Sequence, residues 1–114
     1  REPEIVQLCE VLNQNGVKID GIGSAILTIH PTSSDLIDIA DFSIIPDRIE
    51  AGTYLCAASI TKSTLTLNNV EAKHLGAVIS KLEEMGNSFE TTDNTITIYP
   101  ANELKSVKII TQEY

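Results

Sequence analysis

The sequence has no tryptophan and few aromatic residues of any kind, since phenylalanine and tyrosine together make up only 4% of its 114 residues. The core must therefore be built from aliphatic side chains. Hydrophobic residues still make up 42% of the chain. A chain with this content can form a hydrophobic core, so we do not expect an intrinsically disordered protein. A chain of this length fits one domain and can bury roughly two thirds of its unfolded surface.

Positive charge is also scarce, with eight bases against sixteen acids and a net charge of -8. The bases form no run and are not interleaved with aromatic residues, so we expect no nucleic acid partner. No basic amphipathic helix and no apolar run approaching roughly 20 residues is present, so we expect no membrane partner. The eight bases are Arg1, Lys18, Arg48, Lys62, Lys73, Lys81, Lys105 and Lys108.

There are two cysteines, Cys9 and Cys56, and both lie in helical patterns. Neither belongs to a CxxC motif and no histidine cluster accompanies them, so we expect no metal site. We expect both thiols to lie on buried helix faces as small core residues, in a reduced, cytoplasmic setting. No cofactor is expected.

Residues 4–31 and 73–100 repeat one pattern: a helix, a short strand, a turn and an alternating strand. Each predicted helix ends at a glycine, Gly16 or Gly86, which favours a left-handed stop. The turns "DGIGS" and "TTDNT" are rich in turn-forming residues, which predicts a hairpin in each copy. The apolar stripes of the helices are Ile5, Leu8, Cys9 and Leu12 in the first copy, and Leu75, Val78, Ile79 and Leu82 in the second.

Further elements are predicted around the second copy. The alternating "IADFSIIP" at 39–46 predicts a strand, 47–60 a helix, and 63–70 a strand. One side of that helix carries Ile49, Thr53, Cys56, Ala57 and Ile60.

These elements predict an α+β fold made of β-α-β-α-β-β modules. Residues 1–38 would be the helix-strand-strand end of one module, and 39–100 a complete module. Residues 101–114 would begin the next module, with a lone strand at 105–112. The open sheet edges of such an excerpt favour self-association.

The stretch "PDRIEAGTYLCAA" (46–58) predicts a helix start, with Asp47 as the cap and Glu50 three places on, a capping-box variant. Arg48 is unusual in the first turn, because the helix dipole favours acids there.

The segments "REPEIV", "PDRIEAGTYLCAA" and "HLGAVISKLEEMG" resemble parts of the UDP-N-acetylglucosamine 1-carboxyvinyltransferase family, and the resemblance covers nearly the whole chain. It implies an enzyme of two lobes, each of three modules, of which this chain would be an internal quarter. The family moves enolpyruvyl from phosphoenolpyruvate to the 3'-hydroxyl of UDP-N-acetylglucosamine and releases phosphate, in cytoplasmic peptidoglycan precursor synthesis for the cell wall.

The resemblance also implies site residues. Asp47 and Arg48 match a pair near the hinge between the lobes, and Glu2 and Glu4 match acids near the same junction. Our hypothesis is that Arg48 forms salt bridges between the lobes. The alternative is that Asp47 only caps its helix, Arg48 is solvated, and Glu2 and Glu4 merely favour a helix N-terminus.

No catalytic residue is expected within the chain. The family's reactive cysteine and its phosphoenolpyruvate-binding bases lie outside the matched region, and neither cysteine here corresponds to that cysteine. His30 and His74 have no nearby nucleophile in the sequence. We expect the chain alone to be inactive. The alternatives are a relative of the sister family, 3-phosphoshikimate 1-carboxyvinyltransferase, and a non-catalytic α+β interaction module.

Overall fold

The structure, a computed structural model, describes residues 1–33 and 36–111. Within these residues the chain forms two compact units, 1–45 and 46–111, which are described separately.

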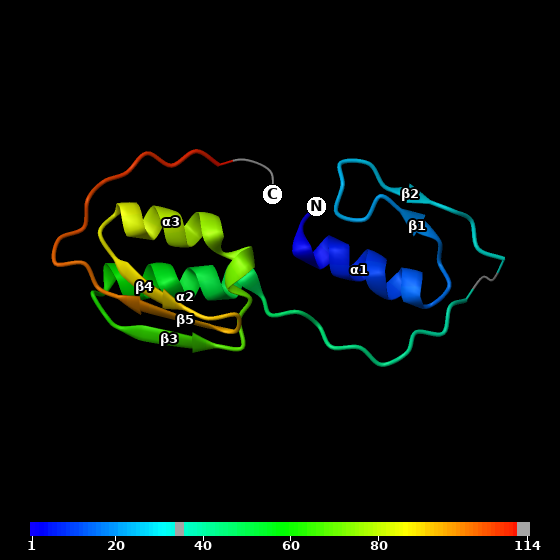
Figure 1. The fold of residues 1–114 in the computed structure, drawn as a ribbon, viewed down its shortest axis with the longest axis horizontal. Helices are drawn as coiled ribbons and strands as arrows, with labels where there is room; N and C mark the ends of the chain where they lie inside the picture. The colour runs from blue at the N-terminus through cyan, green and yellow to red at the C-terminus, as the bar shows by residue number, and fades with distance from the viewer. Residues whose placement is uncertain (34–35, 112–114) are drawn as a thin grey trace. The chain divides into compact units, whose positions relative to one another are not determined.

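The first unit packs one helix against a short hairpin (Figure 1). The helix α1 (Pro3–Gln14) is followed by β1 (Ile19–Asp20) and β2 (Thr28–Ile29), which pair antiparallel with Ile19 opposite Ile29. The small core consists of Cys9, Val17 and Ile19, with Leu12 and Ile22 packed against it.

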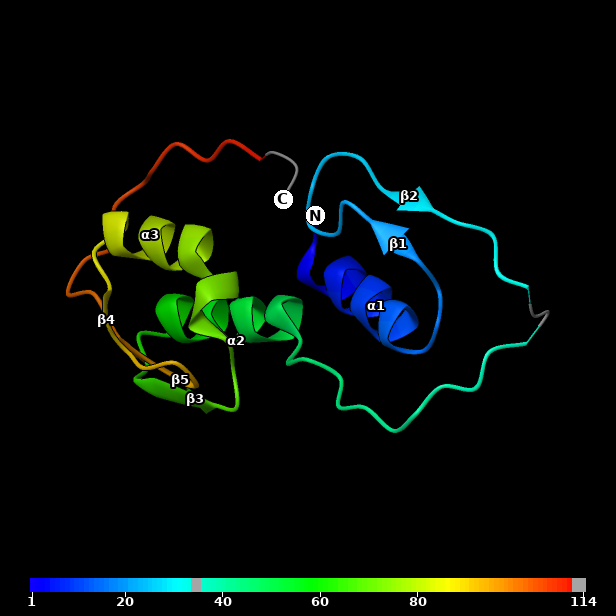
Figure 2. The ribbon, with the colours of Figure 1, turned by 45° about the vertical axis from the view of Figure 1, so that its right-hand side comes forward.

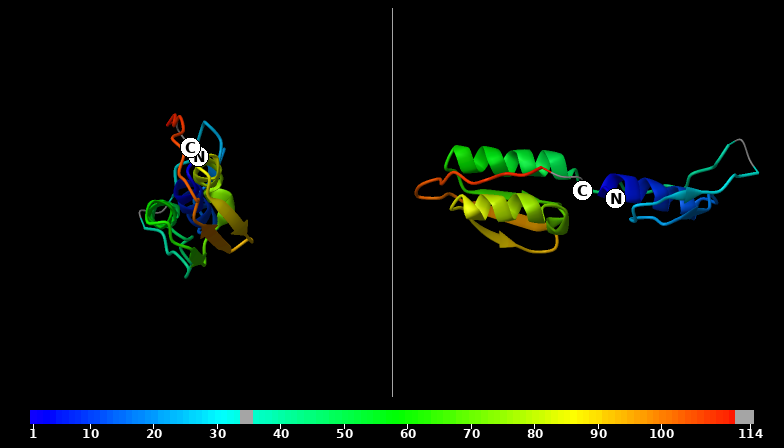
Figure 3. Two further views of the ribbon diagram at one scale, coloured as in Figure 1. Left: turned by 90° about the vertical axis from the view of Figure 1, so that its left-hand side faces the viewer. Right: turned by 90° about the horizontal axis from the view of Figure 1, so that it is seen from above.

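The second unit places two helices on one face of a three-stranded sheet (Figures 1 and 2). The sheet order is β3-β5-β4 and both pairings are antiparallel, so β5 is central. Figure 3 shows the two helices running alongside each other. In chain order the elements are α2 (Arg48–Ile60), β3 (Leu65–Asn68), the 3-10 turn η1 (Ala72–His74), α3 (Gly76–Glu84), β4 (Ser88–Thr91) and β5 (Thr95–Tyr99).

The core of the second unit lies between the helices and the sheet. Leu55 of α2 and Ile96 and Ile98 of β5 are fully buried there. The other face of the sheet is polar, and its Thr66 and Thr97 hydroxyls lie 2.9 Å apart. The alternating pattern of β5 therefore separates an apolar face under the helices from a solvated face.

The predicted repeat is confirmed, together with its turns, its glycine stops and the α+β class. Gly16 and Gly86 have φ of +95° and +108°. In both copies the residue after the glycine donates its N–H to the carbonyl five residues back, Val17 to Leu12 and Asn87 to Leu82. This is the pattern of a Schellman motif, in which glycine avoids the strain of a left-handed residue.

The strand predicted over 39–46 is wrong, because residues 37–46 form neither helix nor strand. A strand requires a neighbouring strand to complete its hydrogen bonds, and here a side chain takes that place. The amide of Gln7 donates to the Ser43 carbonyl at 2.7 Å and accepts from the Ile45 N–H at 3.1 Å.

The lone strand predicted over 105–112 is also wrong over 105–111, and Gln112 lies outside the described residues. The Lys105 N–H donates to the Met85 carbonyl at 3.0 Å, but no strand of the described residues pairs with the segment. The predicted module boundaries, 1–38, 39–100 and 101–114, stay a prediction.

The helix predicted over 47–60 is confirmed, but its buried side is not the expected one. Ala51, Leu55 and Ala58 face the core, whereas Cys56 and the other residues of the predicted side are exposed. A Cβ added at Gly52 would lie 3.6 Å from Leu75 Cδ2. That is an ordinary van der Waals distance, so Gly52 lies on the packed face of α2 together with Ala51, Leu55 and Ala58. The expected burial is confirmed for Cys9 only.

Candidate functional site

Asp47 and Arg48 stand at the N-terminus of α2. The Asp47 carboxylate accepts hydrogen bonds from the N–H groups of Ile49 at 2.8 Å and Glu50 at 3.1 Å. The predicted cap is confirmed, and it satisfies two of the backbone donors that a helix start leaves unpaired. Glu50 makes no return bond in the described chain, so the capping box is only half formed.

Asp47 and Arg48 both line a shallow depression of about 160 Å³ that is open to solvent. This space includes open solvent, and the depression encloses essentially no volume of its own, unlike the pockets of roughly 300–1,000 Å³ that enclose small-molecule ligands. It therefore offers a contact surface and does not enclose a substrate. Its lining residues are Pro46, Asp47, Arg48, Ala51, Val70, Glu71, His74 and Leu75.

Glu71 is the acidic centre of this depression. Lys73 Nζ lies 2.7 Å from its carboxylate and His74 Nε2 lies 3.5 Å from the same oxygen. The hydrogen bond from Lys73 is the main cause that lowers the pKa of Glu71, partial burial opposes it, and His74 adds a smaller lowering. Glu71 is therefore ionised at neutral pH.

His74 is a largely buried polar residue of the depression, with 13% of its side chain exposed. Its Nδ1 is buried and has no hydrogen-bond partner in the described chain. His74 closes the turn η1, and α3 begins two residues later at Gly76. Neither Glu71 nor His74 was expected as a site residue from the sequence. Their spacing of three residues directly after a strand was the signal that could have found them.

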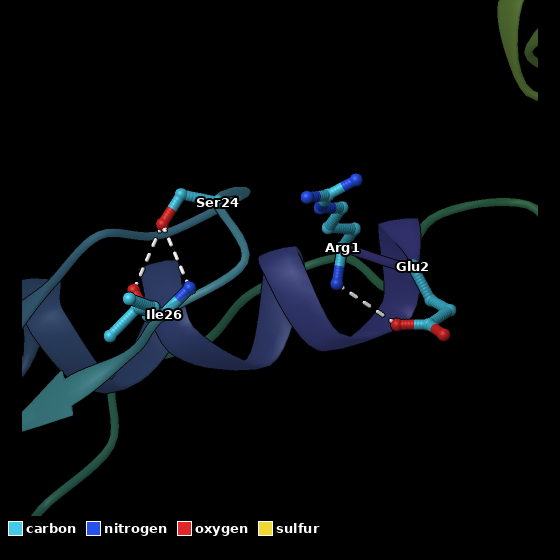
Figure 4. Close-up of polar contacts among 4 residues, drawn as sticks. All are labelled: Arg1, Glu2, Ser24 and Ile26. Carbon is cyan, nitrogen blue, oxygen red and sulfur yellow. Dashed lines mark hydrogen bonds and ion pairs between the residues drawn. The ribbon is translucent and has the colours of Figure 1, made fainter. Parts of the chain in front are cut away.

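Glu2 and Glu4 lie at the start of α1, in the first unit. The Glu2 carbonyl accepts from the N–H of Ile5 and Val6, and its carboxylate lies 3.0 Å from the terminal ammonium of Arg1 (Figure 4). A bond from its own backbone N–H and the terminal ammonium lower the pKa of Glu2. Glu4 occupies the first turn, where an acid favours the helix dipole.

The "DGIGS" turn forms a hairpin loop and no phosphate cradle. Ser24 Oγ lies 2.9 Å from the Ile26 carbonyl oxygen and 3.3 Å from the Ile26 nitrogen, which closes the loop internally (Figure 4). Gly21 has φ of +79°, and a Cβ there would lie 2.1 Å from the Ile26 carbonyl oxygen, so only glycine fits.

The described residues offer little further chemistry. Among them no three His, Cys, Asp or Glu side chains converge in a way that could hold a metal ion. None of the helices described has the length and apolar character needed to cross a membrane. Over residues 1–33 and 36–111, both cysteines are free thiols.

The fold and the sequence together define the class of protein. The sequence model of the family described as EPSP synthase (3-phosphoshikimate 1-carboxyvinyltransferase) matches residues 1–114, and the chain belongs to that family.

Among curated proteins, the chain is similar to three that are named UDP-N-acetylglucosamine 1-carboxyvinyltransferase. Identity over 114 residues is 68% with the protein of Sulfurimonas denitrificans, 58% with that of Campylobacter lari and 54% with that of Helicobacter hepaticus. Each comparison covers the whole of this chain but only 27% of the relative's length. The chain thus spans about a quarter of the proteins it matches.

Proposed function

We propose that this chain is an internal part of a UDP-N-acetylglucosamine 1-carboxyvinyltransferase, which moves enolpyruvyl from phosphoenolpyruvate to the 3'-hydroxyl of the amino sugar. The observation that carries this is the identity of 54–68% over all 114 residues with proteins of that name. The enzyme would act in the cytoplasm, in synthesis of the peptidoglycan precursor.

Within that enzyme the chain supplies framework, and the reacting groups lie outside it. Both substrates carry several negative charges, which require convergent bases or a cradle of backbone amides. The chain has sixteen acids against eight bases, and its depression is shallow and holds Asp47 and Glu71 beside Arg48 and His74. These features support an inactive chain. We expect no phosphate release from phosphoenolpyruvate and UDP-N-acetylglucosamine, and measurable turnover would overturn this part.

The contact residues of the proposal are Asp47, Arg48, Glu2 and Glu4, at the junction between the two lobes. Asp47 caps α2 and thereby fixes the backbone of Arg48 at the rim of the depression. Arg48 would form salt bridges across the junction when the lobes close over the substrates, while Glu2 and Glu4 would stand near it. Such a contact acts on closure and so on turnover.

Substitutions at Asp47 in the longer enzyme separate capping from the interlobe contact. Asp47→Asn keeps a good cap without the charge, whereas Asp47→Ala removes both and costs about 1 kcal/mol of helix stability. We expect both variants to lower kcat, with the Asn variant as stable as the parent. If Asp47→Asn has the kcat of the parent enzyme while Asp47→Ala does not, Asp47 acts only as a helix cap. Unchanged turnover in a folded Ala variant would reject the role of Asp47.

The sister activity, transfer to 3-phosphoshikimate, is the second candidate because the matching family model bears that name. The curated relatives at 54–68% identity bear the amino-sugar name and favour the first. Assays of the longer enzyme with each acceptor in turn, following phosphate release, decide between the two.

We further propose that the 114-residue chain self-associates through its unpaired strand-like segments. Residues 37–45 and 105–111 form no strand, and large apolar side chains such as Phe42, Ile44 and Ile110 are exposed on them. Unpaired edges of this kind invite pairing with another chain. Light scattering that reports a monomer at every concentration would contradict this.

A further inference from the structure

Two stretches of the chain are rich in apolar side chains but form neither helix nor strand: residues 36–41, here called the acidic segment, and residues 105–110, the basic segment. Leu36 and Ile39 of the acidic segment are 85% and 50% exposed, and Ile109 and Ile110 of the basic segment are 65% and 71% exposed. Rows of exposed aliphatic side chains with high β-propensity are typical of strands that lack a partner.

The charges of the two segments are complementary. The acidic segment contains Asp38 and Asp41 and no base, and the basic segment contains Lys105 and Lys108 and no acid. The two members of each pair are three residues apart. None of the four side chains forms an ion pair within the described chain. Equal spacing of opposite charges allows both pairs to meet in one register.

An antiparallel register that places Asp38 opposite Lys108 also places Asp41 opposite Lys105. The same register matches the remaining positions by size and polarity, with no apolar residue opposite a charge. The other pairs are Leu36 with Ile110, Ile37 with Ile109, Ile39 with Val107, and Ala40 with Ser106. Cross-strand pairs of aliphatic residues and of opposite charges each stabilise a sheet.

In the acidic segment, the backbone N–H and C=O groups that this register requires are available for pairing. Successive residues of a strand direct their N–H and C=O groups to opposite edges. The Ala40 N–H donates to Asn15 Oδ1 at 3.0 Å, which occupies one edge at that point. On the other edge, neither Ile37 nor Ile39 makes a backbone hydrogen bond in the described chain.

Within the described chain, the one backbone hydrogen bond of the basic segment is at its start, where the Lys105 N–H donates to the Met85 carbonyl at 3.0 Å. Val107 and Ile109 make no backbone hydrogen bond in the part of the chain that the structure describes. They are the residues that the register sets opposite Ile39 and Ile37. Over Ile37 and Ile39, and over Val107 and Ile109, the two edges can therefore form a ladder without breaking an existing bond. Lys105 lies on the same edge as Val107, so a backbone pair between Lys105 and Asp41 would replace the bond from Lys105 to Met85.

We propose that the acidic segment of one copy pairs antiparallel with the basic segment of a second copy, so that two copies form two such ladders around a two-fold axis. An acidic segment paired antiparallel with its own copy lacks this charge attraction, since it has no base to set against its aspartates. This inference rests on the self-association proposed above and specifies its partner segments and register.

The test is sedimentation of the 114-residue chain and its charge-reversed variants. We expect Asp38→Lys/Asp41→Lys, and separately Lys105→Asp/Lys108→Asp, to weaken dimerisation about tenfold or more, since each ladder then opposes like charges. The chain carrying all four changes should dimerise like the parent, because attraction is restored. Glu10→Lys/Asp93→Lys is the control for Asp38→Lys/Asp41→Lys, since it raises the net charge by the same amount at exposed positions outside both segments.

The outcomes separate the two levels of the proposal. A monomer at all concentrations overturns both self-association and the pairing. If the charge-reversed variants dimerise as strongly as the parent, the proposed pairing is overturned but self-association stands. The same holds if the variant with all four changes does not regain the parent's dimerisation. Circular dichroism confirms that each variant is folded.

A disulfide tests the register itself. Ala40 and Ser106 stand opposite each other at a position between hydrogen-bonded pairs, where Cβ atoms are close enough for a disulfide. Ala40→Cys/Ser106→Cys, with exposed Cys56 changed to Ser, should oxidise to a covalent dimer. A disulfide between residues 40 and 106 of the same chain would overturn the pairing of two copies. If no disulfide forms, the proposed register is overturned. The control is Ala40→Cys/Thr111→Cys, in which the two cysteines are not opposite each other, and it should form no disulfide between chains.

Discussion

The two copies of the helix-strand-strand repeat share a sequence pattern but not a degree of burial. In the second copy β5 lies between β3 and β4, and Ile96 and Ile98 are fully buried. In the first copy β2 pairs with β1 alone, and Ile29, which corresponds to Ile98, is 65% exposed. The second copy has α2 and β3 as neighbours in its own unit, and the described residues of the first unit, 1–33 and 36–45, contain no counterpart of either. An alternating pattern therefore specifies a strand, whereas its neighbours decide whether that strand is buried.

The largest effect should distinguish the corresponding isoleucines of the two copies. Ile98→Ala leaves a cavity in a closed core, which costs about 3–4 kcal/mol of unfolding free energy. Ile29→Ala removes a side chain that is already largely solvated, and should cost less than about 0.5 kcal/mol. Urea denaturation followed by residue-resolved NMR measures both. Equal costs would contradict the difference between the copies.

The buried amide of Asn87 provides a second contrast, because the first copy has Val17 at this position. Asn87 Nδ2 donates to Ser59 Oγ at 2.9 Å and to the Leu82 carbonyl at 3.0 Å. Asn87→Val leaves the buried Ser59 hydroxyl without this partner, while the Leu82 carbonyl keeps its bond from the backbone N–H of residue 87. The substitution should cost about 2 kcal/mol.

Adding Ser59→Ala should recover part of that loss, since removing both partners of a buried bond is less costly than removing one. A double variant that loses as much as the sum of the single variants would show that Asn87 and Ser59 act independently. Ser59→Ala alone, measured in the same urea titration, completes the cycle.

The stop glycines should differ by a smaller amount. At Gly86 a Cβ would lie 3.2 Å from the Glu103 carbonyl oxygen, whereas at Gly16 it would meet nothing within 4 Å. Alanine costs about 1–2 kcal/mol in a left-handed conformation, so both substitutions destabilise and Gly86→Ala does so more. Thermal unfolding compares the two variants. A greater loss at Gly16 would mean that the tail of the second unit adapts freely.

How far the sequence predicts this molecule depends on the element. Local signals sufficed for the caps, the glycine stops and the hairpins, because neighbouring residues determine them. The side of α2 that packs was predicted wrongly because Ile49, Thr53, Cys56 and Ile60 form an apolar stripe as regular as the packed one. Only the position of α3 and the sheet shows that the face of α2 with Gly52 is the packed one.

The missing strand at 39–46 has a similar cause. The residues have high β-propensity, but a strand also requires a partner, which no local pattern reveals. For the candidate site, the Asp47 cap followed from the sequence, whereas the depression that brings Glu71 and His74 beside Asp47 depends on packing. The interlobe role of Asp47 and Arg48 stays a prediction.

The smallest contrast is the pH response of one polar pair in each copy. His30 Nε2 lies 2.7 Å from Asp20, and the corresponding Tyr99 hydroxyl lies 2.9 Å from Glu90. The bond from His30 lowers the pKa of Asp20, and the bond to Glu90 raises the pKa of Tyr99.

The two shifts act at opposite ends of the pH scale. The contribution of Asp20 is present above its unfolded pKa and is lost as the pH falls through the folded value. That of Tyr99 is present below its unfolded pKa and is lost as the pH rises through the folded value. NMR titration of the carboxyl carbon and of the tyrosine ring follows each group. His30→Phe and Tyr99→Phe are the controls. If the pKa of the Asp20 carboxyl is the same in the parent and in His30→Phe, the proposed effect of His30 is contradicted.

Hydrogen exchange of the backbone amides tests most directly whether neighbours, and not the shared pattern, set the stability of the two copies. We expect the amides of β5 to exchange only on global opening of the second unit, and those of β2 to exchange through local opening. Equal protection of β2 and β5 in the same sample would contradict this.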